Sequence, residues 1–225
     1  VHFSRNFNNA FWNGEQMVYG DGDGARFIRL TKALDVVGHE LSHGVVQHTS
    51  NLVYQDQSGA LNEHFADVMG ELVDQWKNRF TVDTANWYMG GAIIAPNVGA
   101  QGIRVFTAER AYENNPILGT DIQTKHMRDY LTGEQLEDLI GSDDNGGVHI
   151  NSGIPNHAFY LVARRLGGHA WEKAGQIWYQ TLLRLNANSQ FQDAAETTID
   201  QATKLFGAEE VTAVRDAWGQ VGIEV

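Results

Sequence analysis

Apolar residues change their spacing near Thr31, and this change divides the chain into two parts. Residues 1–31 hold short apolar runs among Asn and Gly, such as 16–19 before the glycine-rich cluster 20–24, which is typical of strands and loops. After Thr31, which could cap a helix, apolar residues recur every three or four positions at Leu34, Val37, Leu41 and Val45. This spacing predicts a helix over about 32–48.

Helical spacing returns after a loop that contains Tyr54. A second helix is predicted over about 59–77, with apolar residues at Leu61, Phe65, Val68, Met69, Leu72 and Trp76. Residues 78–100 are rich in loop markers, so we expect no long element there. An irregular acidic segment is expected before residue 147. Further helices are predicted over about 104–114, 152–166, 169–186, 190–206 and 208–218.

The composition is that of a globular protein with a sizeable core. Of 225 residues, 42% are apolar and 20% are charged, and 28 acidic residues against 16 basic ones give a formal net charge of -12. Such a field repels phosphate groups, so we expect neither nucleic acid nor an anionic membrane surface as a partner. Because the chain contains no cysteine, any metal must be held by imidazole and carboxylate groups.

The chain has no pattern that predicts a membrane span or a signal peptide. No stretch approaches the roughly 20 apolar residues of a span, and residues 1–5 lack the charged and apolar regions of a signal peptide. We therefore expect a soluble chain that is mature, trimmed or cut. The lack of cysteine fits secretion and the cytoplasm equally well.

The strongest chemical pattern lies in the first predicted helix, where residues 39–43 read HELSH. Two histidines one helical turn apart project from the same face, so His39 and His43 can reach one metal ion. Glu40 lies beside them on the helical wheel, where a general base for water would sit. The alternative is an ordinary helix with two surface histidines.

A catalytic zinc site needs a third protein ligand and one open position. The second predicted helix offers Glu63 and Asp67, which are one turn apart and share a face. One carboxylate can bind the metal while the other accepts a hydrogen bond from the outer nitrogen of a ligand histidine. A solvated acidic face is the alternative for this pair.

Five ordered motifs resemble the thermolysin-like neutral zinc metalloproteases. They are the runs 8–14 (NNAFWNG), 20–24 (GDGDG), 35–43 (DVVGHELSH), 58–63 (SGALNE) and 144–153 (DNGGVHINSG). The resemblance extends from Val1 to the C-terminal helices and is weakest at 78–100 and 107–140. It implies a secreted endopeptidase with zinc on His39, His43 and Glu63, and with Glu40 as base and proton shuttle.

The resemblance also implies roles for residues around the metal. Asp67 matches the residue that partners His39, and Asn62 matches another residue that lies just outside the metal ligands. Tyr54 and His149 match the two donors that hydrogen-bond the oxyanion of the tetrahedral intermediate, and Asp144 matches the carboxylate that orients this histidine. Considered alone, His149 would be an ordinary surface-loop histidine.

Substrate contacts are implied in the same way. Asn9 and Ala10 resemble the strand edge that holds the substrate backbone, and Arg104 matches an arginine that grips a substrate carbonyl. Four apolar positions match the lining of the pocket for the residue after the cut, although each could equally be an ordinary core residue. These positions are Phe27, Leu30, Val36 and Ile103.

The sequence departs from the family in two respects. Family members have a β-rich stretch before the position of Val1, so we expect the chain to be a fragment, a cleaved product or a short relative. A missing N-terminal segment or a propeptide is an expected partner. Family members also bind paired calcium ions, but only Asp35 and Asp74 have counterparts here. With Asn86 and Asp83 as the remaining candidate oxygen donors, we expect at most one weak calcium site.

These observations predict an α+β fold, with a β-rich N-terminal remnant packed against a mainly α-helical C-terminal domain and zinc in the cleft between them. Residues 1–48 form the N-terminal region that ends in the zinc-binding helix, and residues 49–225 form the helical domain. The predicted function is a zinc-dependent endopeptidase that prefers bulky apolar residues just after the cut. An exopeptidase with the same metal site, and a binding module that keeps zinc for folding, are the alternatives.

Overall fold

The N-terminal part contains a small antiparallel hairpin. The computed structural model describes residues 2–225, so the prediction for Val1 lies outside the described residues. Strand β1 (Ala10–Trp12) pairs with β2 (Met17–Tyr19), with Ala10 opposite Tyr19. The turn uses Gly14 at a φ of 96°, a left-handed conformation that favours glycine. The expected mixture of strands and loops in this part is therefore confirmed.

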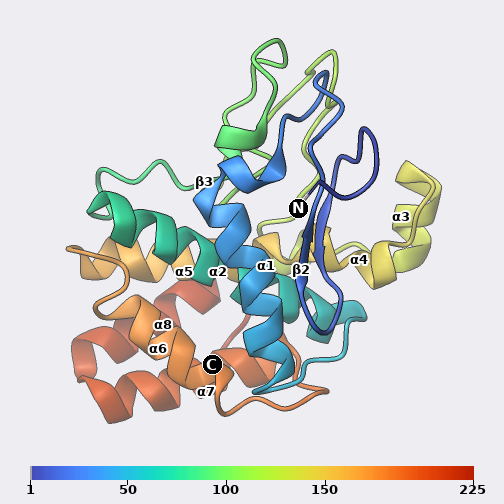
Figure 1. Ribbon diagram of the computed structural model, residues 1–225. Coiled ribbons are helices and arrows are strands. Elements are labelled where there is room, and N and C mark those ends of the chain that lie inside the picture. The colour runs from blue at the N-terminus through green and yellow to red at the C-terminus, as the bar shows by residue number, and fades with distance from the viewer. Residues whose placement is uncertain (1) are drawn as a thin grey trace.

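Two long helices follow the hairpin. Helix α1 (Leu34–Gln47) comes after a short 3-10 turn, η1 (Leu30–Lys32), and α2 (Asp56–Asn78) begins a few residues earlier than predicted. Helix α2 ends at Asn78, and the next residue, Arg79, adopts a left-handed conformation of the kind common at helix ends. Figure 1 shows α1 in the middle of the molecule, beside the hairpin.

The backbones of α1 and α2 approach closely at a pair of glycines. A Cβ atom added to Gly38 would lie 3.0 Å from the Cα of Gly70, and one added to Gly70 would collide with the carbonyl oxygen of Asp35. Only residues without a side chain permit this approach. As a consequence, side chains on the facing sides of the two helices can reach a common point.

The C-terminal part is mainly helical, as expected. Its helices are α3 (Gly133–Ile140), α4 (Asp144–Asn151), α5 (Gly153–Leu166), α6 (Ala174–Leu182), α7 (Phe191–Leu205) and α8 (Ala208–Gln220). Helix α3 was missed within the segment predicted to be irregular. Its signal was present, because Thr132 and Gln135 form a capping box before the apolar residues Leu136, Leu139 and Ile140.

The helix predicted over 104–114 is wrong. Strand β4 (Arg104–Val105) instead pairs with β3 (Tyr88–Met89), and the chain continues as irregular structure with 3-10 turns η2 (Gly91–Ile93) before it and η3 (Met127–Asp129) after it. Phe106 packs against Trp87 and Phe159, at ring-centroid distances of 5.9 and 6.3 Å. Pairing with a distant segment and burial of Phe106 outweigh the local helical preference.

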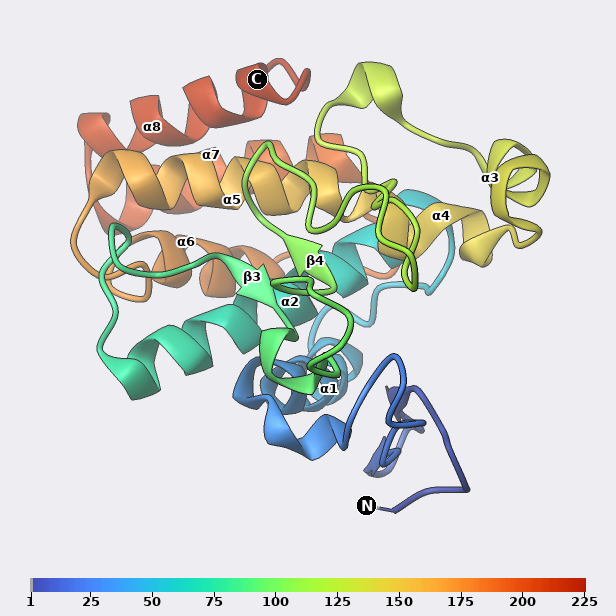
Figure 2. The same ribbon diagram turned by 90° about the horizontal axis from the view of Figure 1, so that it is seen from above.

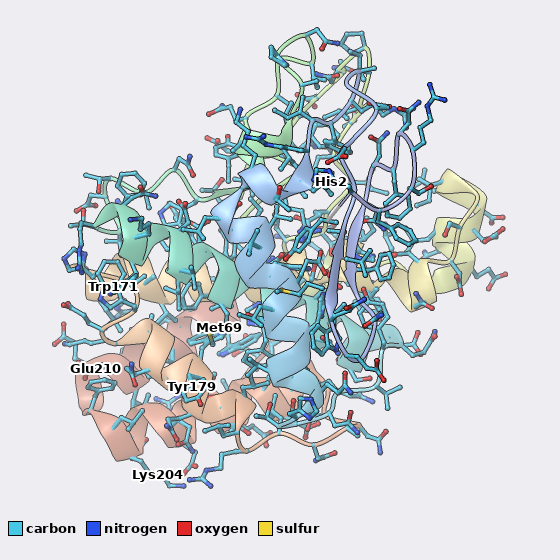
Figure 3. All side chains as sticks on the ribbon, viewed as in Figure 1. His2, Met69, Trp171, Tyr179, Lys204 and Glu210 are labelled. Carbon is cyan, nitrogen blue, oxygen red and sulfur yellow. The ribbon has the colours of Figure 1, made fainter. Side chains whose placement is uncertain are left out.

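The main hydrophobic core lies among the helices of the C-terminal part. Trp178 on α6 and Trp218 on α8 are fully buried and stacked, with ring centroids 6.3 Å apart. Figure 2 shows α5 to α8 gathered on one side of α1 and the hairpin on the other, and Figure 3 shows Lys204 and Glu210 at the outer edge of the helical part. No helix within residues 2–225 is long and apolar enough to span a membrane.

Helix α2 buries a polar pair one turn beyond Asp67. Glu71 is almost fully buried, and its Oε1 accepts a hydrogen bond of 2.8 Å from Nε2 of Gln75. Burial, followed by the negative charges of Asp35, Asp74 and Asp67, raises the pKa of Glu71 to about 8. The folded protein therefore holds a proton on Glu71 that the unfolded chain releases near the ordinary glutamate pKa of 4.5.

This proton predicts that Glu71→Gln makes stability less dependent on pH. The free energy of unfolding falls as the pH rises wherever the folded state binds more protons, here between pH 4.5 and about 8. One pKa unit corresponds to about 1.4 kcal/mol, so the wild-type protein should lose more than about 1 kcal/mol across this window relative to Glu71→Gln. Denaturant unfolding at several pH values measures the difference, with exposed Glu137→Gln as the control. Parallel pH curves for wild type and Glu71→Gln would show that Glu71 is charged in the folded protein.

Candidate active site and metal centre

His39 and His43 on α1 and Glu63 on α2 bring their ligand atoms to one point. One atom from each residue lies within 4.8 Å of the others. The Nε2 atoms of the two histidines are 3.0 Å apart, and the Glu63 carboxylate oxygens lie 3.5 Å from His39 Nε2 and 3.4 Å from His43 Nε2. The close contact of α1 and α2 at Gly38 and Gly70 produces this convergence.

The outer nitrogens of both histidines face hydrogen-bond acceptors. His39 Nδ1 lies 2.8 Å from Asp67 Oδ1, and His43 Nδ1 lies 2.8 Å from Asn62 Oδ1. Asn62 is held in turn, since its Nδ2 donates to the carbonyl oxygen of Leu52 at 3.1 Å. With Nδ1–H engaged on each ring, both Nε2 atoms can present lone pairs to the shared point.

These residues fit a zinc ion. Two imidazole lone pairs and a carboxylate are the donor set of a catalytic zinc site, which leaves a fourth position for water or substrate. Glu63 Oε2 is buried and has no hydrogen-bond partner among residues 2–225, an arrangement that costs free energy unless a cation accepts the lone pair. His39, His43 and Glu63 are therefore the residues that would hold the metal.

Buried charges around the metal centre depend on one another. Burial raises the pKa of Glu63, but His149, His43, His39 and Arg104 outweigh this effect and lower it to about 2. The pKa of Asp67 likewise stays well below its usual range, because Arg104 and His39 outweigh the effect of burial. Nη2 of Arg104 lies 2.6 Å from Asp67 Oδ1, so Arg104 and His39 share this oxygen.

Glu40 follows His39 directly on α1 and lines the same cleft as the three ligands. Its carboxylate is buried. Burial, and to a smaller degree the negative charge of Glu63, raises its pKa above the usual value. A carboxylate with a raised pKa is a stronger base than an exposed one, which suits proton transfer near neutral pH.

Tyr54 and His149 lie next to each other and beside Glu63. Tyr54 Oη donates to Glu63 Oε1, and His149 Nε2 lies 3.1 Å from Tyr54 Oη. Burial and the charge of Glu63 raise the pKa of Tyr54, which keeps its hydroxyl proton in place. Burial lowers the pKa of His149, but the carboxylates of Glu63 and Asp144 outweigh it and raise the pKa to about 9. Both side chains are therefore hydrogen-bond donors.

Asp144 holds His149 through a left-handed turn at the start of α4. Asp144 and Asn145 have φ angles of 51° and 49°, followed by Gly146 and Gly147 at 78° and 83°. Glycine adopts such angles without strain, and Asp and Asn tolerate them better than most residues. The turn brings Asp144 Oδ1 to 2.6 Å from His149 Nδ1, and Oδ2 accepts from the His149 backbone N–H at 2.8 Å.

A cleft of about 640 Å³ contains most of the sequence-predicted site residues. The predicted polar residues that line it are Asn9, His39, Glu40, His43, Tyr54, Asn62, Glu63, Arg104 and His149. Ala10 and the four predicted apolar pocket residues Phe27, Leu30, Val36 and Ile103 also line it. Asp67 and Asp144 lie behind this lining, each against a histidine.

Sequence patterns missed several cleft residues. Phe11 and Trp12 of the hairpin, together with Met89 and Ile93, also line the cleft. Phe11 and Trp12 lie within the motif at 8–14, which was the available signal. Met89 and Ile93 lie in the segment where no element could be assigned, and only their distant pairing with Ile103 and Ile28 brings them to the site.

The two calcium candidates lie together at a second cavity of about 440 Å³. Asp35, Asp74 and Asn86 line it, as do the cationic side chains of Lys32 and Lys77. Both oxygens of Asp35 already accept hydrogen bonds, from the backbone N–H groups of Val36 and Gly90. Asp83 does not line this cavity and pairs with Arg164 instead.

Comparisons with known proteins agree with this geometry. Residues 1–47 match the family description "Thermolysin metallopeptidase, catalytic domain", and residues 50–223 match "Thermolysin metallopeptidase, alpha-helical domain". An extracellular metalloprotease from Pectobacterium carotovorum subsp. carotovorum is 45% identical over 227 residues, which cover 100% of this chain and 63% of the relative. Thermolysin from Alicyclobacillus acidocaldarius is 37% identical over 233 residues, covering 99% of this chain and 39% of the relative.

The fold also matches a solved structure. The precursor of protealysin, a metalloproteinase from Serratia proteamaculans, superposes with a TM-score of 0.92 at 46% sequence identity, and the match covers 99% of this chain and 67% of that one. This chain spans less than two thirds of the length of the Pectobacterium and Alicyclobacillus relatives. Family motifs, helical architecture and metal-ligand geometry agree, and the chain belongs to the thermolysin family of metallopeptidases.

Proposed function

We propose that this chain carries the metal site and catalytic groups of a zinc-dependent endopeptidase. The observation that carries the proposal is the position of His39, His43 and Glu63 in a cleft that Glu40 also lines. Relatives described as an extracellular metalloprotease and as thermolysin support it. The division at residues 48 and 49, secretion, and a further N-terminal segment or propeptide as partner belong to the same proposal.

Peptide hydrolysis needs a base for water and a proton for the leaving amine. A zinc ion held by His39, His43 and Glu63 would supply Lewis-acid polarisation and a lowered pKa for water. Glu40 takes a proton from the attacking water while the oxygen of that water bonds to the scissile carbonyl carbon. The protonated Glu40 then gives this proton to the amide nitrogen as the carbon–nitrogen bond breaks, so that the carboxylate is restored.

Tyr54 and His149 stabilise the negative charge that develops on the carbonyl oxygen. Both are donors beside Glu63, and Asp144 fixes the ring of His149. Donors fixed in advance in a partly dry cleft often supply a few kcal/mol of transition-state stabilisation. Tyr54 and His149 would exchange their mutual contact for the oxyanion when substrate is bound.

Substrate is held by residues that line the same cleft as Glu63. Asn9 directly precedes β1 and Ala10 is its first residue, and both offer backbone groups of this strand to the substrate backbone. Arg104 offers its guanidinium to a substrate carbonyl. Phe27, Leu30, Val36 and Ile103 give one part of the cleft an apolar lining, and none of these four side chains carries a charge. This pocket favours a bulky apolar side chain just after the cut.

Cleavage of a peptide library blocked at both ends tests the function and its alternatives. The zinc-loaded chain should cut internal bonds before bulky apolar residues, because the pocket buries apolar surface at about 25 cal/mol per Å². An exopeptidase would leave blocked peptides intact and cut their unblocked versions. A binding module would bind zinc and cut neither set, and a preference for charged residues after the cut would contradict the pocket.

Glu40→Gln should keep zinc but lower hydrolysis by about 10³-fold or more, because the amide cannot accept the proton of water. Steady-state kinetics on the zinc-replete variant measure the loss. His149→Ala is the comparison, since loss of an oxyanion donor should lower kcat by about a hundredfold with little change in KM. Near-normal turnover of zinc-replete Glu40→Gln would assign the base to another residue.

One zinc ion should bind per chain, and His43→Ala should weaken its binding strongly because a ligand is lost. Elemental analysis and metal titration of chelator-treated protein measure both effects. His48→Ala is the matched control, since His48 is an exposed histidine at the end of the same helix. Equal zinc binding by the two variants would favour the alternative of unrelated surface histidines.

Calcium should bind weakly, with at most one ion near Asp35 and Asp74. Calcium takes six to eight oxygen ligands, whereas these carboxylates share their cavity with Lys32 and Lys77. Calorimetric titration of the zinc-loaded chain measures the stoichiometry, and Asp83→Ala is a control because Asp83 pairs with Arg164. Two tight equivalents that disappear together in Asp74→Ala would contradict this expectation.

A further inference from the structure

A continuous chain of buried hydrogen bonds runs from the helical core to the metal centre. Trp178 Nε1 donates to His64 Nε2 at 2.7 Å, and His64 Nδ1 lies 2.7 Å from Asn156 Oδ1. Asn156 Nδ2 donates to Asp67 Oδ2 at 2.9 Å. Asp67 Oδ1 then lies 2.8 Å from Nδ1 of His39.

We propose that Trp178, His64 and Asn156 are positioning residues for the metal centre, which act through Asp67 on the ligand His39. None of the three lines the substrate cleft. The proposal rests on the proposed function, because the positioned group is the zinc-binding histidine.

Donor chemistry gives the chain one direction. An indole N–H can only donate, so the close contact with Trp178 requires a lone pair on His64 Nε2 and a proton on Nδ1. His64 therefore donates to Asn156 Oδ1, which turns the amide nitrogen of Asn156 toward Asp67. The opposite amide orientation would put an oxygen against the Asp67 carboxylate.

The direction of this hydrogen-bond chain decides which oxygen of Asp67 is left to accept from His39. Its Oδ2 is occupied by Asn156, while Oδ1 accepts from both His39 and Arg104. Without the Asn156 donor, Oδ2 would be a buried acceptor with no other partner among the hydrogen bonds of the described residues, and the carboxylate could rotate toward Arg104. His39 would then lose the acceptor that fixes its ring and keeps its Nε2 lone pair toward the metal.

The hydrogen-bond chain also joins helices that are distant in sequence. Trp178 is on α6, His64 and Asp67 are on α2, Asn156 is on α5, and His39 is on α1. His64, Asn156, Trp178 and Asp67 are almost completely buried. Because buried networks with every member satisfied are rigid, packing of the helical part is transmitted to the orientation of His39.

Zinc affinity tests the proposal without relying on catalysis. Chelator competition at fixed pH measures the affinity of the full chain. Asn156→Leu removes the donor to Asp67 and should weaken zinc binding roughly tenfold or more, the effect of losing outer partners of metal ligands. Trp178→Phe removes only the first donor and should weaken it by about threefold, the effect of one hydrogen bond.

Trp218→Phe is the matched control for Trp178→Phe. Trp218 is equally buried in the same core, but its indole donates to Thr198 Oγ1 at 2.8 Å, outside the chain to Asp67. This variant should lose stability in denaturant unfolding yet change zinc affinity by less than about twofold. If Asn156→Leu does not fold, the two tryptophan variants decide the question.

Nitrogen NMR of the imidazole rings supplies a second readout. His64 should carry its proton on Nδ1 in the wild-type protein, and Trp178→Phe should allow the other tautomer to appear. A proton on Nε2 in the wild type, or equal zinc affinity in Trp178→Phe and Trp218→Phe, would overturn the proposal. Unchanged zinc affinity in an active chain would leave the endopeptidase function standing, whereas zinc binding without hydrolysis would overturn that function alone.

Discussion

The glycine contact between α1 and α2 is the constraint on which the metal centre depends. Gly38 and Gly70 bring two helix backbones so close that a Cβ atom at Gly70 would collide with the carbonyl oxygen of Asp35, and one at Gly38 would press against the Cα of Gly70. His39 and His43 then face Glu63 and Asp67 across a gap that imidazole and carboxylate groups can bridge. A wider crossing would separate the ligands and leave their polar groups buried and unpaired.

The metal centre buries negative charge that nearby positive charges and hydrogen-bond donors must offset. Glu63 and Asp67 are completely buried, and Arg104 is the nearest fixed cation, at 2.6 Å from Asp67. Asp67 is satisfied by Asn156, His39 and Arg104, whereas Glu63 keeps one oxygen without a hydrogen-bond partner among the described residues. A bound cation would complete the compensation at Glu63, so binding of metal and stability of the fold are linked.

Local patterns in the sequence predicted the helices that carry the site. Apolar spacing indicated α1 and α2 and most of the C-terminal helices, and the spacing of His39 and His43 indicated a shared face. Such local patterns could not predict contacts between residues that are far apart in the sequence. The strand at Arg104 depends on Met89, and the approach of Asn156 to Asp67 joins residues far apart in the chain. The capping box of α3 was readable but was missed.

X-ray absorption at the zinc edge tests the central claim most directly, because it reports the ligands around the metal without requiring activity. For the zinc-loaded chain we expect nitrogen and oxygen ligands at about 2.0–2.1 Å, with the scattering pattern of two imidazoles and no sulfur. A third imidazole would show that His149, whose Nε2 lies 3.5 Å from Glu63 Oε1, has entered the coordination shell. That result, or a single imidazole, would contradict a centre built from His39, His43 and Glu63.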